Sequence, residues 1–138
     1  MTSNEPEALT TNESRIHTIL LVVEDDEAIS EFIAQVLQDQ TPHAVLDVSD
    51  ASEALAAVSS ITPSLFILDY QLPDMNGLEL SDHLHAIEGL ETVPTLMMSA
   101  NLPPRQELQQ RHIASLSKPF EVSALLKIID TLLPPQDG

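Results

Sequence analysis

Two hydrophobic patterns alternate along this 138-residue chain, and this alternation restricts its possible folds more than any other feature. Short runs made almost entirely of apolar residues are typical of strands buried on both faces. Such a run predicts a strand at residues 19–23, further strands are predicted at residues 65–68 and 94–98, and a weaker one at 44–48 and a brief one at 113–117 complete the set. Between the strands, apolar residues recur three and four positions apart, which is the stripe of an amphipathic helix. The first stripe comprises Ile29, Phe32, Ile33, Val36 and Leu37.

Four further helices complete the pattern. They are expected after the capping residue Asp50, after the turn at Asn76-Gly77, around residues 105–111 and across residues 122–133. Five strands alternating with five helices predict a parallel sheet covered on both faces, an α/β three-layer sandwich with right-handed crossovers. The pattern alone does not fix the strand order, but five strands fit the flavodoxin-like, doubly wound order 2-1-3-4-5 better than the six-stranded dinucleotide-binding order.

The chain is expected to hold one domain at residues 16–133. Residues 1–15 are polar and acidic and are interpreted as a flexible N-terminal tail, and residues 134–138 as a C-terminal tail. No output domain fits after Leu133, so we expect the domain to act alone. The N-terminus has no signal-peptide pattern, and no apolar run approaches the ~20 residues of a membrane helix. These features favour a cytoplasmic protein.

The charge of the chain excludes several classes of function. Five Lys and Arg residues stand against 22 Asp and Glu, giving a net charge of −17, and residues 16–104 contain no Lys or Arg. Binding to nucleic acid or to an anionic membrane surface needs a basic patch that this chain cannot supply. The absence of cysteine excludes disulfides, thiolate zinc sites and thiol catalysis.

Polar residues stand where four of the predicted strands end. Glu24-Asp25-Asp26 follow the first strand, Asp69 the third, Ser99 the fourth and Lys118 the fifth. Ligands of doubly wound sheets bind beyond the carboxyl ends of the strands. Taken alone, the acidic triplet is more typical of a solvated loop in which Asp26 caps the next helix. Converging carboxylates would instead repel one another, and a divalent cation with a preference for oxygen, such as Mg²⁺, would relieve that repulsion. Carboxylates, a bound cation, the hydroxyl of Ser99 and the ammonium of Lys118 are the groups that phosphoryl transfer onto an aspartate requires.

With these residues in place, the chain resembles the receiver domains of response regulators over residues 16–133. The resemblance is carried by four segments in the family's order: Ile19–Asp26, Leu68–Gly77, Ser99-Ala100 and Lys118-Pro119-Phe120.

The resemblance implies a role for each site residue. Asp69 would be the phosphoacceptor, Ser99 would hydrogen-bond the phosphoryl group, and Lys118 would be its cationic partner. Mg²⁺ would be bound directly by Asp25 and Asp69, mainly through water by Glu24, and by the backbone carbonyl of Gln71. The Lys118–Pro119 bond would be cis. Gln71 and Asn101 would flank the acyl phosphate and tune its hydrolysis, although both also fit as ordinary loop residues.

The resemblance also implies a function. The domain would accept a phosphoryl group from a sensor histidine kinase or a histidine phosphotransfer protein in a Mg²⁺-dependent phosphorelay, as a monomer or weak dimer, and would signal by protein–protein contact. It would catalyse only its own phosphorylation and dephosphorylation, and is therefore not expected to be an enzyme. Two alternatives stay open: a relay intermediate or phosphate sink without conformational output, and a degenerate module that binds its partner constitutively.

Two other classes fit less well. A flavin-binding electron carrier would have its phosphate repelled by the triplet at residues 24–26. A phosphatase of the haloacid-dehalogenase type carries its nucleophile after the first strand, whereas Asp69 follows the third.

Some positions depart from the family or have a simpler interpretation. Ser115 stands where many receivers have an aromatic residue, so the family's usual switch, in which that aromatic side chain changes rotamer, is not expected. The segment from Ser99 to Lys118 is also a few residues short. His83 and His85 are interpreted as surface residues, and Met97-Met98 as part of the core.

Overall fold

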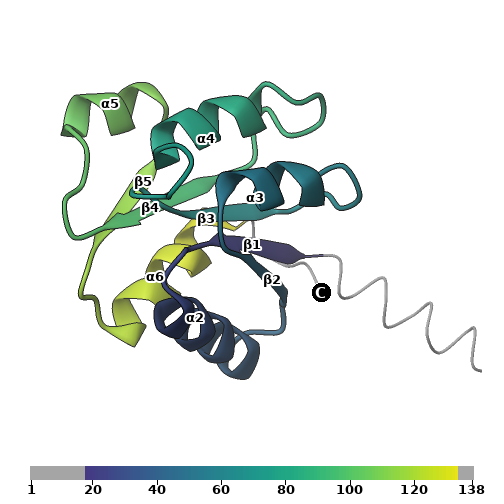
Figure 1. Ribbon diagram of the computed structural model, residues 1–138. Coiled ribbons are helices and arrows are strands. Elements are labelled where there is room, and N and C mark those ends of the chain that lie inside the picture. Colours follow the sequence, from purple (N-terminus) through teal and green to yellow (C-terminus); the bar gives the residue numbers. More distant parts are fainter. Residues whose placement is uncertain (1–17, 134–138) are drawn as a thin grey trace, which may run out of the picture.

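The computed structural model describes residues 18–133, which form a five-stranded parallel sheet (Figure 1). The strands lie in the order β2-β1-β3-β4-β5 and comprise β1 (Ile19–Val23), β2 (Ala44–Val48), β3 (Leu65–Asp69), β4 (Thr95–Ser99) and β5 (Ala114–Ser117). The predicted strand order and fold class are therefore confirmed. The tails predicted at residues 1–15 and 134–138 lie outside the described residues.

Helices cover both faces of the sheet. They are α2 (Glu27–Gln40), α3 (Ala51–Ala57), α4 (Gly77–His85), α5 (Arg105–Gln110) and α6 (Val122–Leu132). In Figure 1, α3, α4 and α5 lie on one side of the sheet, and α2 and α6 on the other. In residues 18–133, no helix has both the length and the apolar character needed to cross a membrane.

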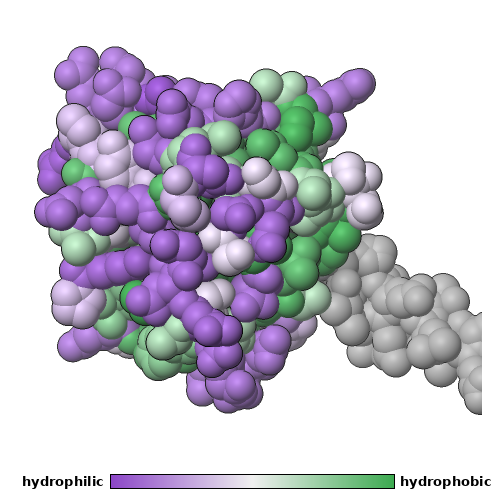
Figure 2. All heavy atoms as spheres, in the orientation of Figure 1, coloured by the Kyte–Doolittle hydropathy of each residue, from purple (hydrophilic) through white to green (hydrophobic). Residues whose placement is uncertain are grey.

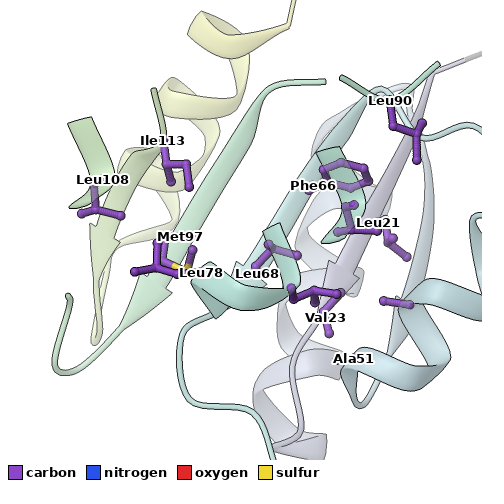
Figure 3. Close-up of a cluster of buried hydrophobic side chains, with 13 residues drawn as sticks. Leu21, Val23, Ala51, Phe66, Leu68, Leu78, Leu90, Met97, Leu108 and Ile113 are labelled. Atoms are coloured by element: carbon purple, nitrogen blue, oxygen red, sulfur yellow. The ribbon is translucent and has the colours of Figure 1, made fainter. Parts of the chain in front are cut away.

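The core has two halves because successive strand residues point to opposite faces of the sheet. Figure 3 shows the half beneath α3, α4 and α5, where Leu21, Phe66 and Met97 are fully buried. The half beneath α2 and α6 contains the residues next to these, for example Leu20 and Ile67. Since β3 and β4 are buried along their whole length, their last residues, Asp69 and Ser99, are buried too.

Polar residues fix the starts of three helices. Asp26 caps α2 by accepting a hydrogen bond from the amide of Ile29 (3.0 Å), and Asp50 caps α3 in the same way (2.8 Å from the amide of Glu53). Asn76 and Glu79 form a capping box at the start of α4. The capping roles considered for Asp26 and Asp50 are confirmed, and each cap places a helix directly after a loop at the carboxyl edge of the sheet.

Two predictions about individual side chains were wrong. Phe32, assigned to the buried stripe of α2, is 48% exposed, because the buried face of that helix is set by Ser30, Ile33, Ala34 and Leu37. His85 is half-buried rather than a surface residue: its ring packs edge-on against Phe66 and its Nε2 lies 2.9 Å from the carbonyl oxygen of Val93. His83 is exposed, and Met97 and Met98 are in the core, as predicted.

Candidate functional site

The predicted site residues meet at one edge of the sheet because all the strands are parallel. Val23 and Leu68 are register partners, which places Glu24 and Asp69 side by side on β1 and β3. The sheet ladder continues one residue past β5, where the amide of Lys118 donates to the carbonyl of Ser99 (3.0 Å). The structure thus brings residues from four strand ends to the same place.

Three carboxylates converge at this edge. Glu24, Asp25 and Asp69 each offer one oxygen atom, and these atoms lie within 4.8 Å of one another. Glu24 and Asp69 are 1% and 4% exposed, whereas Asp25 faces solvent. Buried carboxylates at this separation repel one another, and carboxylate oxygens are the ligands that Mg²⁺ prefers. The donor set therefore fits a hard divalent cation.

The ammonium group of Lys118 neutralises part of this negative charge. Its Nζ lies 2.6 Å from Oε1 of Glu24 and 3.5 Å from Oδ2 of Asp69. The second oxygen of Glu24 accepts a hydrogen bond from the amide of Asp26 (3.0 Å). Burial raises the pKa of Glu24 above its ordinary value, and the ammonium offsets part of that rise. Lys118 is therefore bound most closely to Glu24 and only secondarily to Asp69.

The loop after β3 holds the other oxygen of Asp69. The amide of Gln71 donates to Oδ1 (3.2 Å), and Gln71 itself pairs with Asn76 in an antiparallel bridge. Gly77 closes the loop, with its amide donating to the carbonyl of Tyr70 (2.7 Å).

Gly77 is required by close packing, which its interpretation as a turn residue did not reveal. A Cβ atom at this position would lie 2.6 Å from the sulfur of Met97 and 2.7 Å from the carbonyl oxygen of Asp69. Only glycine lets α4 begin this close to the end of β3.

Ser99 is buried, but its hydroxyl makes its hydrogen bonds away from Asp69. It accepts from the amide of Asn101 (3.0 Å) and donates to the carbonyl of the same residue (3.1 Å). The sequence did not reveal this partnership, which involves the backbone of Asn101 and not its side chain. Ser115, in the position that is aromatic in many receivers, is exposed on β5.

An apolar pocket of about 310 Å³ adjoins the cluster. It is lined by Ile29, Phe32, Ala100, Lys118, Pro119 and Phe120, so Lys118 borders both the pocket and the carboxylates. The Lys118–Pro119 bond in its wall is cis, as the resemblance implied. The half-exposed ring of Phe32 on α2 is part of the pocket lining. Sequence reasoning missed the pocket because it placed Phe32 in the core. Figure 2 shows a face that is largely hydrophilic at the left and centre of the view, with a hydrophobic band down its right side.

The doubly wound sheet, with an acidic cluster, a lysine and a hydroxyl at its carboxyl edge, defines a signalling receiver. The family model of the response regulator receiver domain matches residues 20–130, so the chain belongs to this family of two-component signalling. An acidic pocket of the kind at which receiver domains bind Mg²⁺ is present.

Similar proteins include whole receivers and parts of much larger proteins. The chain is 29% identical over 127 residues to hybrid signal transduction histidine kinase D of Dictyostelium discoideum, covering 88% of this chain and 8% of that protein. It is 37% identical over 81 residues to the DNA-binding response regulator MtrA of Mycolicibacterium smegmatis, covering 59% of this chain and 34% of MtrA. The chain thus spans about a third or less of the length of these relatives. Among solved structures, the chemotaxis response regulator CheY4 of Vibrio cholerae superposes with a TM-score of 0.78 at 28% identity, covering 84% of this chain and 98% of CheY4.

Proposed function

We propose that Asp69 accepts a phosphoryl group from a phosphohistidine, carried by a sensor histidine kinase or a histidine phosphotransfer protein, in a Mg²⁺-dependent phosphorelay. The observation that carries this proposal is the position of the Asp69 carboxylate. It is almost fully buried at the end of β3, 3.5 Å from the Lys118 ammonium and within 4.8 Å of a carboxylate oxygen of Glu24 and of Asp25.

The transfer exchanges one bond at phosphorus for another. An oxygen of Asp69 forms a bond to phosphorus while the phosphorus–nitrogen bond of the donor breaks, and the electron pair leaves with the imidazole, which takes up a proton. Such reactions depend mainly on positioning and on neutralising the charge of the phosphoryl oxygens. Asp25 and Asp69 would hold Mg²⁺ directly, with Glu24 mainly through water and the backbone carbonyl of Gln71 completing the set, and the ion would supply part of that neutralising charge.

The residues of the chain itself supply the rest. Gln71 fixes the carboxylate by donating to Oδ1, and Lys118 lies beside Oδ2 as a cation for a phosphoryl oxygen. Ser99 offers a hydroxyl donor once its bond to Asn101 is broken. In this proposal the domain catalyses its own phosphorylation and dephosphorylation.

The apolar pocket supports direct docking of the donor protein. A phosphohistidine must reach Asp69 at the carboxyl edge of the sheet, and the half-exposed ring of Phe32 lies next to that approach because Lys118 lines both places. We propose that the histidine-bearing domain of the donor covers Phe32 during transfer. Output then follows through protein contacts.

Intact-mass measurement tests the proposal. The wild-type protein incubated with Mg²⁺ and acetyl phosphate should gain the mass of one phosphoryl group, and Asp69→Asn should gain none. Asp25→Ala should need far more Mg²⁺. The matched control is Asp39→Asn, which removes an exposed carboxylate near the far end of α2 and should label as the wild type does. Equal labelling of Asp69→Asn would refute the assignment, and an unlabelled wild type would favour the degenerate binding module.

A further inference from the structure

The loop at residues 70–76 joins β3 to α4 and carries two functions of the proposed site. The amide of Gln71 holds Oδ1 of Asp69, and its carbonyl is the backbone ligand that the family resemblance assigns to Mg²⁺. The position of Gln71 therefore depends on what holds this loop in place. Its ends are fixed by the Gln71–Asn76 bridge and by the bond from Gly77 to Tyr70.

The tip of the loop is fixed by Asp74, which reaches across to α3. One carboxylate oxygen accepts the amide of Ala51 (3.1 Å), and the other accepts the amide (3.0 Å) and the hydroxyl (3.2 Å) of Ser52. These bonds join residues 22 and 23 positions apart in the sequence. Within residues 18–133, they are the hydrogen bonds that tie the segment 71–76 to an element other than β3 and α4.

The geometry of this contact is that of a strong anchor. An ionised carboxylate bound to amides at a helix N-terminus makes charge-assisted hydrogen bonds and is stabilised by the helix dipole. The helix already has its own cap, because Asp50 accepts from Glu53. The bonds of Asp74 satisfy the two preceding amides, and their distinctive effect is to connect α3 to the loop.

The anchor lies close to Gln71 along the chain. Two residues separate Gln71 from Asp74, and one of them is Pro73, whose ring fixes φ and stiffens the connection. Leu72 and Met75, on either side, pack partly buried against the core beneath α3 and α4. A movement of Asp74 away from α3 would therefore be transmitted to Gln71.

We propose that Asp74 is a positioning residue for the proposed phosphorylation site: by binding the first amides of α3 it holds Gln71 where its amide orients Asp69 and where its carbonyl would be available to the metal. This inference rests on the proposed function. It gives α3, which contributes no ligand of its own, a part in setting the affinity for Mg²⁺.

The test compares two caps of the same helix. Mg²⁺ binding to the full chain is measured by titration calorimetry for the wild type, Asp74→Ala, Asp74→Asn and the control Asp50→Ala. Both alanine variants remove one negative charge and one cap at the start of α3, but only Asp74→Ala releases the loop. Exchange of the Gln71 amide is measured by NMR in metal-free samples, which gives a readout independent of metal and of activity.

The expected result is a difference between the two alanine variants. The Kd for Mg²⁺ should rise about ten-fold in Asp74→Ala, the lower end of the range for groups that orient a metal ligand. The Kd of Asp50→Ala should stay within about two-fold of the wild type, because the Asp50 side chain caps α3 and, within the described residues, makes no hydrogen bond to the loop. The Gln71 amide should exchange faster in Asp74→Ala alone. Asp74→Asn keeps one acceptor oxygen, so its Kd for Mg²⁺ and its Gln71 exchange rate should lie between those of the wild type and Asp74→Ala.

The other possible results decide the proposal as follows. Equal effects of Asp74→Ala and Asp50→Ala on Kd and on exchange would overturn the proposal, since charge or helix stability would then explain them. Unchanged values in Asp74→Ala would also overturn it. If Asp74→Ala does not fold, Asp74→Asn decides by the same two readouts. If the wild type binds no Mg²⁺, the proposed function fails, and Gln71 exchange alone still decides whether Asp74 is the anchor.

Discussion

The Lys118 ammonium is the only protein cation at the carboxylate cluster in the described residues, so its removal should destabilise the metal-free domain. Lys118→Met keeps the length of the side chain but leaves Glu24 and Asp69 without their partner. The three side chains are 16%, 1% and 6% exposed, and the ammonium lies 2.6 Å and 3.5 Å from the two carboxylates. Truncating one partner of a buried ion pair costs about 3–5 kcal/mol.

We expect a loss near the lower end of that range, about 3 kcal/mol, because Lys118 keeps some contact with solvent. For a domain of this size that is a fall in Tm of about 10 °C. Urea unfolding followed by far-UV circular dichroism measures the loss directly. The control is Lys127→Met, which removes an exposed lysine on α6 that forms no ion pair in the described residues and should change stability by less than about 0.5 kcal/mol. Saturating Mg²⁺ should recover part of the loss, since a bound cation again faces the carboxylates.

The pH dependence of this loss identifies the group left unpaired. Burial raises the pKa of Glu24, and Lys118 offsets part of that rise, so the variant should raise it further. A carboxyl group whose pKa is higher in the folded state binds more protons when folded, and its contribution to stability falls as pH rises from the unfolded pKa to the folded pKa. The loss in Lys118→Met should thus be small near pH 4, around the ordinary carboxyl pKa, and grow toward neutrality. A loss below about 1 kcal/mol at neutral pH, or one equal at both pH values, would refute the reasoning.

Four further outcomes are expected. Mg²⁺ at a hundred times its Kd should stabilise the domain by about 2.7 kcal/mol, and a Tm independent of millimolar Mg²⁺ would contradict the metal site. Gly77→Ala should lower the free energy of unfolding by about 1–3 kcal/mol through overpacking and should slow labelling with acetyl phosphate. The control Gly89→Ala places its Cβ where no atom lies within 4 Å, is strained only by its φ of 93°, and should be labelled at the normal rate. Phe32→Ser should slow transfer from a protein donor several-fold but not labelling by acetyl phosphate; equal slowing would contradict the docking role. Beryllium fluoride should change amide exchange mainly within residues 100–113, and no change there would favour a phosphate sink.

The fold could be predicted because its three central strands, β1, β3 and β4, are largely apolar runs separated by helical stripes, and few architectures bury such strands on both faces. The position of a helix face was harder to predict. In α2, the small residues Ser30 and Ala34 are buried while the larger Phe32 is half exposed. A hydrophobic stripe indicates the side of a helix that faces the core, but the sheet beneath decides which residue at its margin is covered. The burial of His85 could not be predicted either, because it depends on Val93, which lies outside α4 in the segment before β4.

The composition of the site followed from the parallel sheet, which brings strand ends to one edge whatever lies between them. The contacts within the site could not be predicted, because they depend on differences of about an ångström. The sequence does not reveal that Lys118 lies closer to Glu24 than to Asp69, or that Ser99 bonds to the backbone of Asn101. It also does not reveal that Asp74 reaches α3, since that contact depends on how the loop is folded.

These contacts have a common consequence for activation. Both groups that would bind a phosphoryl group on Asp69 are already engaged elsewhere: the ammonium of Lys118 with Glu24 at 2.6 Å, and the hydroxyl of Ser99 with Asn101 at 3.0 Å and 3.1 Å. In the proposed reaction, phosphorylation would exchange these bonds for bonds to the phosphoryl oxygens, which would release the backbone of Asn101 and free one oxygen of Glu24. Since Ser115 carries no ring that could respond to such a shift, we expect the segment after β4 to take it up. We therefore expect the conformational response in the segment at residues 100–113, and amide exchange with beryllium fluoride tests this expectation.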